Sequence, residues 1–312
     1  MDKQTVLELK DLNVDILMAL LGENDSNLKT IGQYFGTELT LEEDRLVCPD
    51  EEKVKGISEV LQELLTLYRM KKGLEKEDVT SVLVNKASAS FFRKEIATGS
   101  GNRRFYLRSR GQKELYEAFE NHIITIVTGP AGTGKTFLSV VYASNLLKKG
   151  AIRKIIITRP VVEAGESLGF LPGDLKEKVD PYLKPIYDSL EMIFGMGNTD
   201  KLLEKGVVEI APLAYMRGRT LNDACVILDE AQNTTEMQIK MFLTRLGFNS
   251  RMIITGDITQ IDLPNNKPSG LVRIREIVGN IDEIAFIETS SRDVVRHPVV
   301  QKIIDAYEKA GK

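Results

Sequence analysis

The stretch that decides the fold is Gly129-Pro130-Ala131-Gly132-Thr133-Gly134-Lys135-Thr136, which fits the pattern GxxxxGK(S/T) at every position. Glycines in this pattern let the backbone curl so that successive N–H groups point inward at a phosphate. Lys135 adds a point charge for the β- and γ-phosphate oxygens, and Thr136 offers a hydroxyl to Mg²⁺. We therefore predict that these eight residues bind ATP.

The sequence on either side of this loop has the strand and the helix that a phosphate loop requires. An apolar, β-branched run precedes it at Ile123–Thr128, and a helical pattern follows from Thr136 to Lys149, with Gly150 as its stop. The positive end of that helix would point at the bound phosphates. This context argues against a chance glycine-rich turn.

Short apolar runs alternate with helical patterns from about residue 112 onward. Buried parallel strands have this texture, because crossover helices cover both faces of their sheet. We predict an α/β P-loop domain over residues 112–312, with a parallel sheet and helices on both of its faces. Its strands are expected at Ile123–Thr128, Lys154–Thr158, Val207–Ile210, Ala224–Leu228, Arg251–Thr255 and Ile284–Ile287.

Two acids end the run Ala224–Leu228. A carboxylate at the end of a buried strand is costly unless a cation or hydrogen bonds meet it. Asp229 is therefore a candidate Mg²⁺ ligand together with Thr136, and Glu230 is a candidate base for the attacking water. The additional glutamate favours hydrolysis over transfer to an acceptor, and two ordinary strand-end acids are the alternative.

A third group of polar residues follows the run Arg251–Thr255. In open α/β sheets, ligands bind at the carboxyl ends of the strands. Asp257 and Gln260 are thus placed to sense the γ-phosphate or to orient the attacking water. The alternative for Asp257 is an aspartate that stabilises a turn.

Composition and charge bound the remaining possibilities. The 312 residues include 42 Lys and Arg against 45 Asp and Glu, a formal net charge of −3, so nucleic acid would have to bind a local patch. Two Cys and two His argue against a disulfide framework or a Cys/His zinc site. No apolar run approaches the ~20 residues of a membrane helix. We expect a cytoplasmic protein without membrane contact.

The charge is distributed unevenly along the chain. Residues 1–50 hold eleven acidic and four basic residues, a net of −7, whereas residues 86–113 hold eight basic residues and one acid, a net of +7. The early part contains one clear amphipathic helix, Val54 to Tyr68. We predict a small α+β domain over residues 1–84 and a basic linker over residues 85–111.

Taken together, these segments resemble the PhoH-like family of ATPases, whose core is similar to that of superfamily 1 helicases. The resemblance covers about residues 105–310 and implies a RecA-like core. The motifs that carry it, besides the phosphate loop, are Thr158-Arg159-Pro160, Leu228-Asp229-Glu230-Ala231-Gln232-Asn233, Thr255-Gly256-Asp257 through Gln260 to Asp262-Leu263-Pro264, and Asp293-Val294-Val295-Arg296-His297-Pro298.

The resemblance also implies roles for single residues. Gln112 occupies the place where related helicases use a glutamine to read adenine, which an amide can do because it both donates and accepts. An exposed, helix-capping glutamine is the alternative. Gln232 and Asn233 resemble residues that couple the metal site to the sensor strand. Thr158-Arg159-Pro160, followed by Glu163, Gly165 and Glu166, resembles a segment along nucleic acid or a subunit interface, or else a plain strand exit.

An arginine is expected to reach the site from a neighbouring subunit. ATPases of this type need one to neutralise transition-state charge, and two-core helicases take it from a second core. This chain has room for one core, so the resemblance implies a head-to-tail homo-oligomer, a ring such as a hexamer. Arg296, Arg217 and Arg219 are the candidates, and Arg296 lies in the family's C-terminal motif. Arg296 could instead anchor the last helix.

The N-terminal segment around Gly22-Glu23-Asn24-Asp25 resembles the GxxG loop of a KH RNA-binding domain. Two acids facing phosphate would repel it, so a KH-like fold with a loop that binds RNA poorly is expected, or else a helix–turn–helix of purely structural or oligomerising use. The basic linker, where Phe105 and Tyr106 lie beside Arg103 and Arg104, is the better candidate for RNA contact, although it could also be a solvated charge run.

The sequence as a whole predicts an Mg²⁺-dependent ATP hydrolase coupled to RNA binding, remodelling or unwinding. The alternative is an ATP-controlled binding switch that regulates a protein or ribonuclease partner without motor activity. A small-molecule kinase is disfavoured, because the sequence has no convincing arginine-rich lid.

Overall fold

The computed structural model of the protein describes residues 4–85, 95–160, 175–264 and 267–294, and residues 300, 303 and 306 beyond them. The chain divides into two compact units. The larger contains residues 95–105 and 111–294, and the smaller contains residues 1–94, 106–110 and 295–312. The division of the sequence into domains at residues 84 and 111 stays a prediction.

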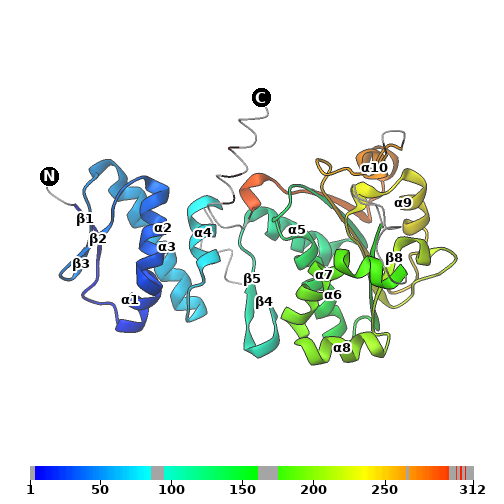
Figure 1. Ribbon diagram of the computed structural model, residues 1–312, viewed down its shortest axis with the longest axis horizontal. Coiled ribbons are helices and arrows are strands. Elements are labelled where there is room, and N and C mark those ends of the chain that lie inside the picture. The colour runs from blue at the N-terminus through cyan, green and yellow to red at the C-terminus, as the bar shows by residue number, and fades with distance from the viewer. Residues whose placement is uncertain are drawn as a thin grey trace. The chain divides into compact units, whose positions relative to one another are not determined.

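A six-stranded parallel sheet in the order β11-β6-β10-β9-β7-β8 is the centre of the larger unit (Figure 1). The predicted α/β fold with a parallel sheet is confirmed, and each of the six predicted runs forms one strand. The strands are β6 (Ile124–Thr128), β7 (Lys154–Arg159), β8 (Val208–Pro212), β9 (Ala224–Leu228), β10 (Arg251–Gly256) and β11 (Ile284–Glu288).

Helices cover both faces of this sheet. Alternate side chains of a strand point to opposite faces, so one set packs with α9 and α10 and the other faces α6, which contacts β7, β9 and β10. Phe242 of α9 and Leu271 of α10 lie in the first of these two cores. The helices are α5 (Arg110–Asn121), α6 (Lys135–Lys148), α7 (Leu175–Phe194), α8 (Met196–Glu204), α9 (Glu236–Leu243) and α10 (Gly270–Val278).

The smaller unit is an α+β domain, as predicted. Its three-stranded antiparallel sheet has the order β1-β3-β2, and its helices pack on a core of buried apolar side chains that includes Leu20, Ile31, Leu46 and Leu61. The elements are β1 (Gln4–Glu8), α1 (Val14–Leu21), α2 (Ser26–Phe35), β2 (Thr40–Glu42), β3 (Arg45–Cys48), α3 (Glu51–Lys71) and α4 (Lys76–Asn85). Its KH likeness stays a prediction.

The predicted linker contains regular structure where the structure describes it. Strands β4 (Glu95–Thr98) and β5 (Arg104–Tyr106) pair as a hairpin. Asn145 of α6 donates to the carbonyl of Ile96, and Lys148 donates to the carbonyl of Thr98 over 2.9 Å. These side chains donate to carbonyls on the hairpin that a third strand would otherwise satisfy. The sequence pattern does not indicate these two contacts. None of the helices in the described segments is long and apolar enough to cross a membrane.

Candidate nucleotide-binding site

The strand register brings the predicted motifs to one edge of the sheet. Gly256 at the end of β10 lies opposite Thr128 at the end of β6, and Leu228 at the end of β9 lies opposite Thr158 of β7. Because all of these strands are parallel, the segments that follow them start side by side. These segments are the phosphate loop after β6, Asp257 after β10, the two acids after β9 and the end of β7.

The phosphate loop has the curled backbone that its sequence predicts. Gly129, Gly132 and Gly134 have φ values of 144°, 86° and 87°, a region that side chains rarely adopt. The ammonium of Lys135 donates to the carbonyls of Gly129 and Pro130, at 2.6 and 2.8 Å. The lysine is therefore folded over its own loop, within reach of any phosphate that the loop holds.

The end of β11 braces this loop from the other side. The Thr289 hydroxyl lies 3.1 Å from the hydroxyl of Thr133, whose own hydroxyl donates to the Pro130 carbonyl over 3.1 Å. A Cβ at Gly129 would lie 2.2 Å from the Thr289 hydroxyl oxygen, so the close approach of the two segments requires glycine there. Thr289 lies outside the loop motif, and no pattern along the chain indicates this contact.

Asp229 and Thr136 come together as the sequence predicts. The Thr136 hydroxyl donates to Oδ1 of Asp229 over 2.7 Å, and the Thr255 hydroxyl at the end of β10 donates to the same oxygen over 2.5 Å. Asp229 is only 4% exposed, so the two hydroxyls compensate its burial. One carboxylate and one hydroxyl beside a phosphate loop form the kind of oxygen donor set that Mg²⁺ takes, with water and substrate phosphate completing the shell.

Glu230 adopts an unusual backbone conformation at the point where β9 ends. Its φ of 55° is left-handed, which costs a non-glycine residue of this kind about 1–2 kcal/mol. Two side chains hold the carboxylate: Nη2 of Arg159 lies 3.0 Å from Oε1, and Nε2 of Gln232 donates to Oε2 over 2.5 Å. The strained turn aims the carboxylate away from the strand axis and toward the end of β7.

Gln232 connects this carboxylate to the neighbouring strand. Its Oε1 accepts from the backbone N–H of Asp257 over 3.0 Å, while its Nε2 donates to Glu230. Asn233 accepts from the backbone N–H of Asp262 over 2.8 Å. Both contacts join the segment after β9 to the segment after β10, which is the geometry that the resemblance implied for these two residues.

Asp257 and Gln260 meet each other in the turn after β10. The Gln260 amide donates to Oδ2 of Asp257 over 3.0 Å, and the backbone and hydroxyl of Thr259 donate to Oδ1. The carboxylate of Asp257 therefore stabilises its own turn, which was the alternative interpretation. A role for either residue toward phosphate or water stays a prediction.

Gln112 is buried at the start of α5 and is not an exposed cap. Its Nε2 donates to the carbonyl of Thr133 in the phosphate loop over 3.1 Å. Asp293, the last residue of the short helix η7 (Ser291–Asp293), accepts from the Gly111 N–H over 2.9 Å and so fixes the helix end that carries Gln112. The glutamine thus lies against the loop that would bind the nucleotide, and adenine recognition stays a prediction.

The three candidate arginines have different surroundings. Arg296 lies outside the described residues, as do Glu163 and its neighbours in the segment after Pro160. Arg219 makes a bidentate ion pair with Glu209 of β8, at 2.5 and 2.8 Å, so its guanidinium is already paired within its own chain. Arg217 is exposed.

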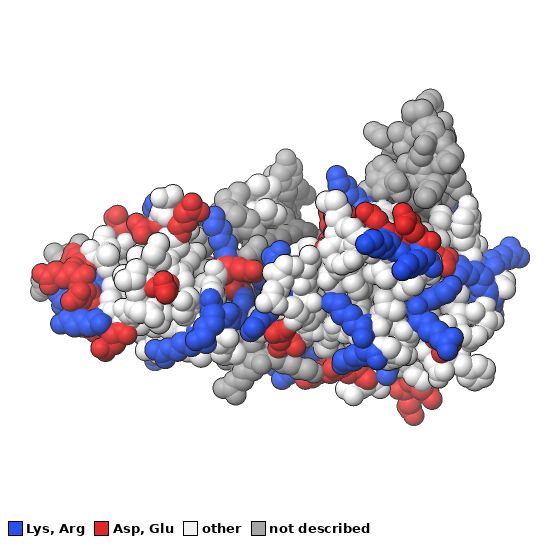
Figure 2. Space-filling model, turned by 90° about the horizontal axis from the view of Figure 1, so that it is seen from below, with Lys and Arg blue, Asp and Glu red and all other residues white. Residues whose placement is uncertain are grey.

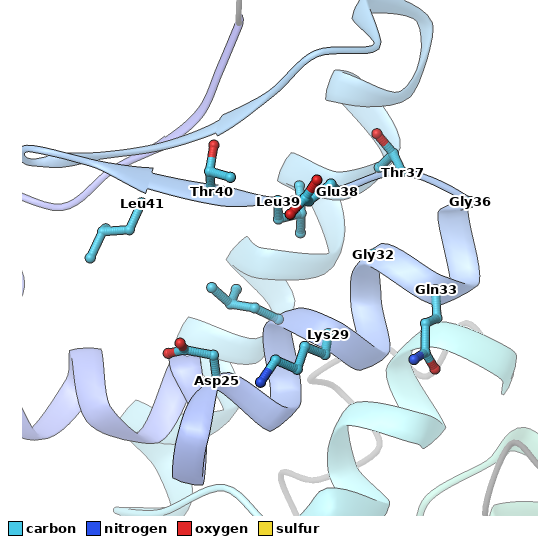
Figure 3. Close-up of a pocket in the computed structure, with 11 residues that line it drawn as sticks. Asp25, Lys29, Gly32, Gln33, Gly36, Thr37, Glu38, Leu39, Thr40 and Leu41 are labelled. Atoms are coloured by element: carbon cyan, nitrogen blue, oxygen red, sulfur yellow. The ribbon is translucent and has the colours of Figure 1, made fainter.

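The N-terminal glycine turn differs from the phosphate loop. Asn24 and Asp25 have φ values of 52° and 58°, and Asp25 lines a groove of about 850 Å³ between α2 and β2 (Figure 3). Lys29 of α2 also lines this groove, but its ammonium donates to the backbone carbonyl of Asn24 over 2.8 Å. An acid therefore stands where a KH loop would approach a phosphate.

The aromatic residues of the basic segment are used for packing. Phe105 is 8% exposed and packs edge-on against Phe137 of α6, with ring centroids 5.2 Å apart, while the Lys71 ammonium lies over the Tyr106 ring. Among the arginines of this segment that the structure describes, Arg103, Arg104 and Arg110 are exposed. Figure 2 shows basic side chains interspersed with acidic ones on the face it presents, so RNA would find charge in patches rather than a broad field.

Sequence reasoning missed the partners that hold the two acids. Arg159 was noted only as part of a motif of open purpose, and Thr255 only as a strand end. Both residues could have been recognised as partners. An arginine or a threonine at the end of one strand can pair with an acid at the end of the neighbouring strand. The strand order, which makes β7 and β10 the neighbours of β9, was needed to recognise them.

Comparison with known proteins agrees with this geometry. The family model described as PhoH-like protein matches residues 105–308. This chain belongs to the PhoH-like family. A PhoH-like protein of Bacillus subtilis is 49% identical over 306 residues, 95% of each chain, and one of Synechocystis is 42% identical over 314 residues, 98% of this chain and 96% of that protein.

Another member of the PhoH-like family matches a smaller part of this chain. The protein PhoH of Escherichia coli is 46% identical over 202 residues, which is 64% of this chain and 57% of that protein. Among solved structures, a SWI2/SNF2 ATPase core from Sulfolobus solfataricus in complex with double-stranded DNA covers 63% of this chain and 46% of its own, at 16% identity and a TM-score of 0.38. The family membership and the sheet together establish a P-loop NTPase fold.

Proposed function

We propose that this protein hydrolyses ATP to ADP and phosphate in the presence of Mg²⁺. The observation that carries the proposal is the convergence of the Thr136 hydroxyl and the Asp229 carboxylate, 2.7 Å apart, with Glu230 as the next residue. A loop that only bound nucleotide would have no use for a second acid in a strained backbone conformation beside the metal ligands. The strain is of the kind found at reactive sites.

Each residue has a distinct task in this scheme. The phosphate-loop N–H groups and Lys135 hold the β- and γ-phosphates, and Gln112, whose amide donates to the Thr133 carbonyl of the loop, reads the adenine base. Mg²⁺, held by Thr136 and Asp229, would neutralise charge on the phosphate oxygens. Glu230 takes a proton from the attacking water, and Asp257 with Gln260 report on the γ-phosphate.

Two variants test the assignment. Lys135→Ala should weaken ATP binding about a hundredfold or more, because a charge-assisted contact to phosphate is lost. Glu230→Gln should bind a fluorescent ATP analogue normally and turn ATP over about 10²–10⁴ times more slowly. Lys149→Ala, an exposed lysine just beyond the end of the same helix, is the matched control. Normal hydrolysis by Glu230→Gln would contradict the base assignment.

RNA is the partner that we propose for the hydrolysis cycle, through binding, remodelling or unwinding. Support comes from the exposed Arg103 and Arg104, presented by a hairpin that is fixed to α6. Replacing both by Gln should weaken RNA binding and reduce its salt dependence, whereas Lys149→Gln and Lys154→Gln together should change neither as much. Equal losses in the two double variants would contradict a specific role for the hairpin.

An ATP-controlled switch that regulates a protein or ribonuclease partner is the second candidate. The Arg159–Glu230 ion pair favours it, because a base held by a cation turns over slowly and prolongs the ATP-bound state. ATPase rates with and without a panel of RNAs distinguish the two. Many-fold stimulation supports the motor, and a flat rate with nucleotide-dependent partner binding supports the switch.

We also propose that the protein acts in the cytoplasm as a head-to-tail homo-oligomer, a ring such as a hexamer, in which a neighbour supplies an arginine. With Arg219 paired to Glu209, Arg296 and Arg217 are the candidates. Mixing Arg296→Ala with Lys135→Ala should restore part of the ATPase activity if one subunit supplies the arginine and the other the loop. Native mass measurement with ATP gives the subunit number. No restoration in mixed assemblies would contradict the role of Arg296.

A further inference from the structure

Both carboxylate oxygens of Glu230 have a partner within the protein. Oε1 lies 3.0 Å from Nη2 of Arg159, and Oε2 accepts from Gln232 over 2.5 Å. A carboxylate that is to take a proton from water needs one oxygen within hydrogen-bond distance of that water. The two partners fix the direction in which these oxygens point, so the carboxylate can turn toward a water elsewhere only when one of the two lets go.

The two partners differ in their freedom to move. Gln232 is 1% exposed, its other amide atom is fixed by the Asp257 N–H, and a Cβ at Gly256 would lie 2.9 Å from it. The Arg159 side chain is 21% exposed and that of Glu230 32% exposed. The guanidinium is thus the partner that solvent, or another anion, can reach.

The register of the sheet fixes where this guanidinium stands. Arg159 ends β7, and the Asp229 N–H donates to the Thr158 carbonyl over 2.9 Å, so Arg159 leaves its strand directly beside the two acids of β9. A guanidinium pairs with phosphate oxygens in the same two-pronged geometry as with a carboxylate. A phosphodiester at the carboxyl end of β7 can therefore replace Glu230 as its partner.

We propose that Arg159 is a positioning residue that restrains Glu230, and that the backbone phosphate of RNA releases the restraint by taking the guanidinium. The inference rests on the proposed ATP hydrolysis with Glu230 as the base. It links RNA binding to turnover through one ion pair, without requiring the phosphate loop to change. No covalent step is involved, since the guanidinium only exchanges one anionic partner for another.

The test compares ATP hydrolysis by the full chain and by Arg159→Gln, with and without poly(U). Poly(U) should raise the turnover of the unchanged protein about tenfold, which corresponds to the loss of one charge-assisted hydrogen bond. Arg159→Gln should show about that raised rate without poly(U), should gain nothing further from it, and should keep its KM for ATP. Arg159→Lys, which keeps the charge, should restore most of the restraint.

Controls separate this role from a structural one. Lys154→Gln removes a charge from the other end of the same strand and should leave the rate and its stimulation unchanged. Affinity for a fluorescent ATP analogue and the thermal unfolding midpoint should stay the same in Arg159→Gln. A merely structural loss would lower turnover and the midpoint together.

Two results would overturn the proposal. One is a turnover of Arg159→Gln that is equal to or below that of the unchanged protein without RNA. The other is a raised turnover that poly(U) still stimulates to the same extent. Failure of the proposed function is recognised separately, because Glu230→Gln would then hydrolyse ATP normally whatever Arg159 does.

Discussion

The turns that lead into α6 and α2 both contain glycine at positive φ, and they have opposite chemistry. The turn before α6 has three glycines at positive φ and a lysine folded over it, whereas the turn before α2 has Asn24 and Asp25 at positive φ and an acid on either side of Asn24. In the first the strained positions have no side chains and the backbone N–H groups can surround an anion. In the second both of those positions have side chains, and that of Asp25 carries negative charge. Backbone curl alone therefore does not make a phosphate site.

The largest effect that would sharpen this comparison is expected at the acids themselves. Asp229→Asn keeps the shape but removes the charge beside Thr136, and turnover should fall about a thousandfold. Asp25→Asn, the same change in the other turn, should leave turnover unchanged. Steady-state ATPase assays over a range of Mg²⁺ concentrations measure both, and similar losses in the two variants would contradict the distinction.

The glycines of the two turns should also respond differently to a methyl group. Gly129→Ala places Cβ 2.2 Å from Oγ1 and 2.3 Å from the backbone oxygen of Thr289, and should lower the free energy of unfolding by about 3 kcal/mol. At Gly22 the nearest atoms belong to the side chains of Asn27 and Ser26 and not to the backbone, and its φ of 75° with ψ of 168° lies in a region almost confined to glycine, so Gly22→Ala should cost less, about 2 kcal/mol. Urea unfolding measures both. Gly150→Ala, also at positive φ but in open space, is the control.

The protein has one buried cysteine in each unit, Cys48 in β3 and Cys225 in β9. Burial raises the pKa of the Cys225 thiol to about 12, so it should react with a thiol reagent at pH 8 only when the sheet opens. ATP at a hundred times its Kd should slow this labelling roughly a hundredfold, because binding stabilises the folded core by about 2.7 kcal/mol. Labelling of Cys48 should change little. Mass spectrometry after timed labelling resolves the two, and equal protection would indicate that they open together.

A smaller effect is expected when the acidic turn is given a glycine. Asp25 stands at φ 58° and its side chain makes no hydrogen bond as the N-cap of α2, so Asp25→Gly removes strain without removing a contact. We expect the N-terminal unit to gain about 0.5–1 kcal/mol, measured by denaturant-dependent labelling of Cys48. Glu23→Gln, which removes a charge but leaves the backbone alone, is the comparison. A loss of stability in Asp25→Gly would show an unrecognised role for the carboxylate.

The smallest effect concerns the pH dependence of the larger unit. Hydrogen bonds from Arg219 lower the pKa of Glu209. A carboxyl whose folded pKa is depressed stabilises the fold above its unfolded pKa of about 4.3, and this contribution is lost as pH falls through the folded pKa. Glu209→Gln should therefore reduce stability by less than about 1 kcal/mol at pH 7, because the pair is partly exposed, and by nothing at pH 2. Urea unfolding at the two pH values, with Asp50→Asn as the N-terminal comparison, measures this.

The accuracy of the sequence prediction differed between local and long-range features. All six core strands and the helix after the phosphate loop were predicted to within two residues, because apolar runs and the glycine pattern are local signals. The pairing of Thr136 with Asp229, 93 residues apart, was also predicted, because the chemistry of the two residues required it. The hairpin at residues 95–106 was interpreted as part of a linker. Its carbonyls accept hydrogen bonds from Asn145 and Lys148, which lie about 50 residues away in the sequence, so no local pattern indicates the contacts that hold it.

The sequence by itself determined the phosphate loop, the α/β architecture and the identity of the two acids, because each depends on residue type and spacing within a short stretch. Only the tertiary structure decided which further side chains each acid touches. The insertion of β10 between β6 and β9 gives Asp229 the Thr255 hydroxyl, and the placement of β7 beside β9 gives Glu230 the guanidinium of Arg159. Strand order is set by packing of the whole sheet, so no local pattern specifies which residue ends beside which.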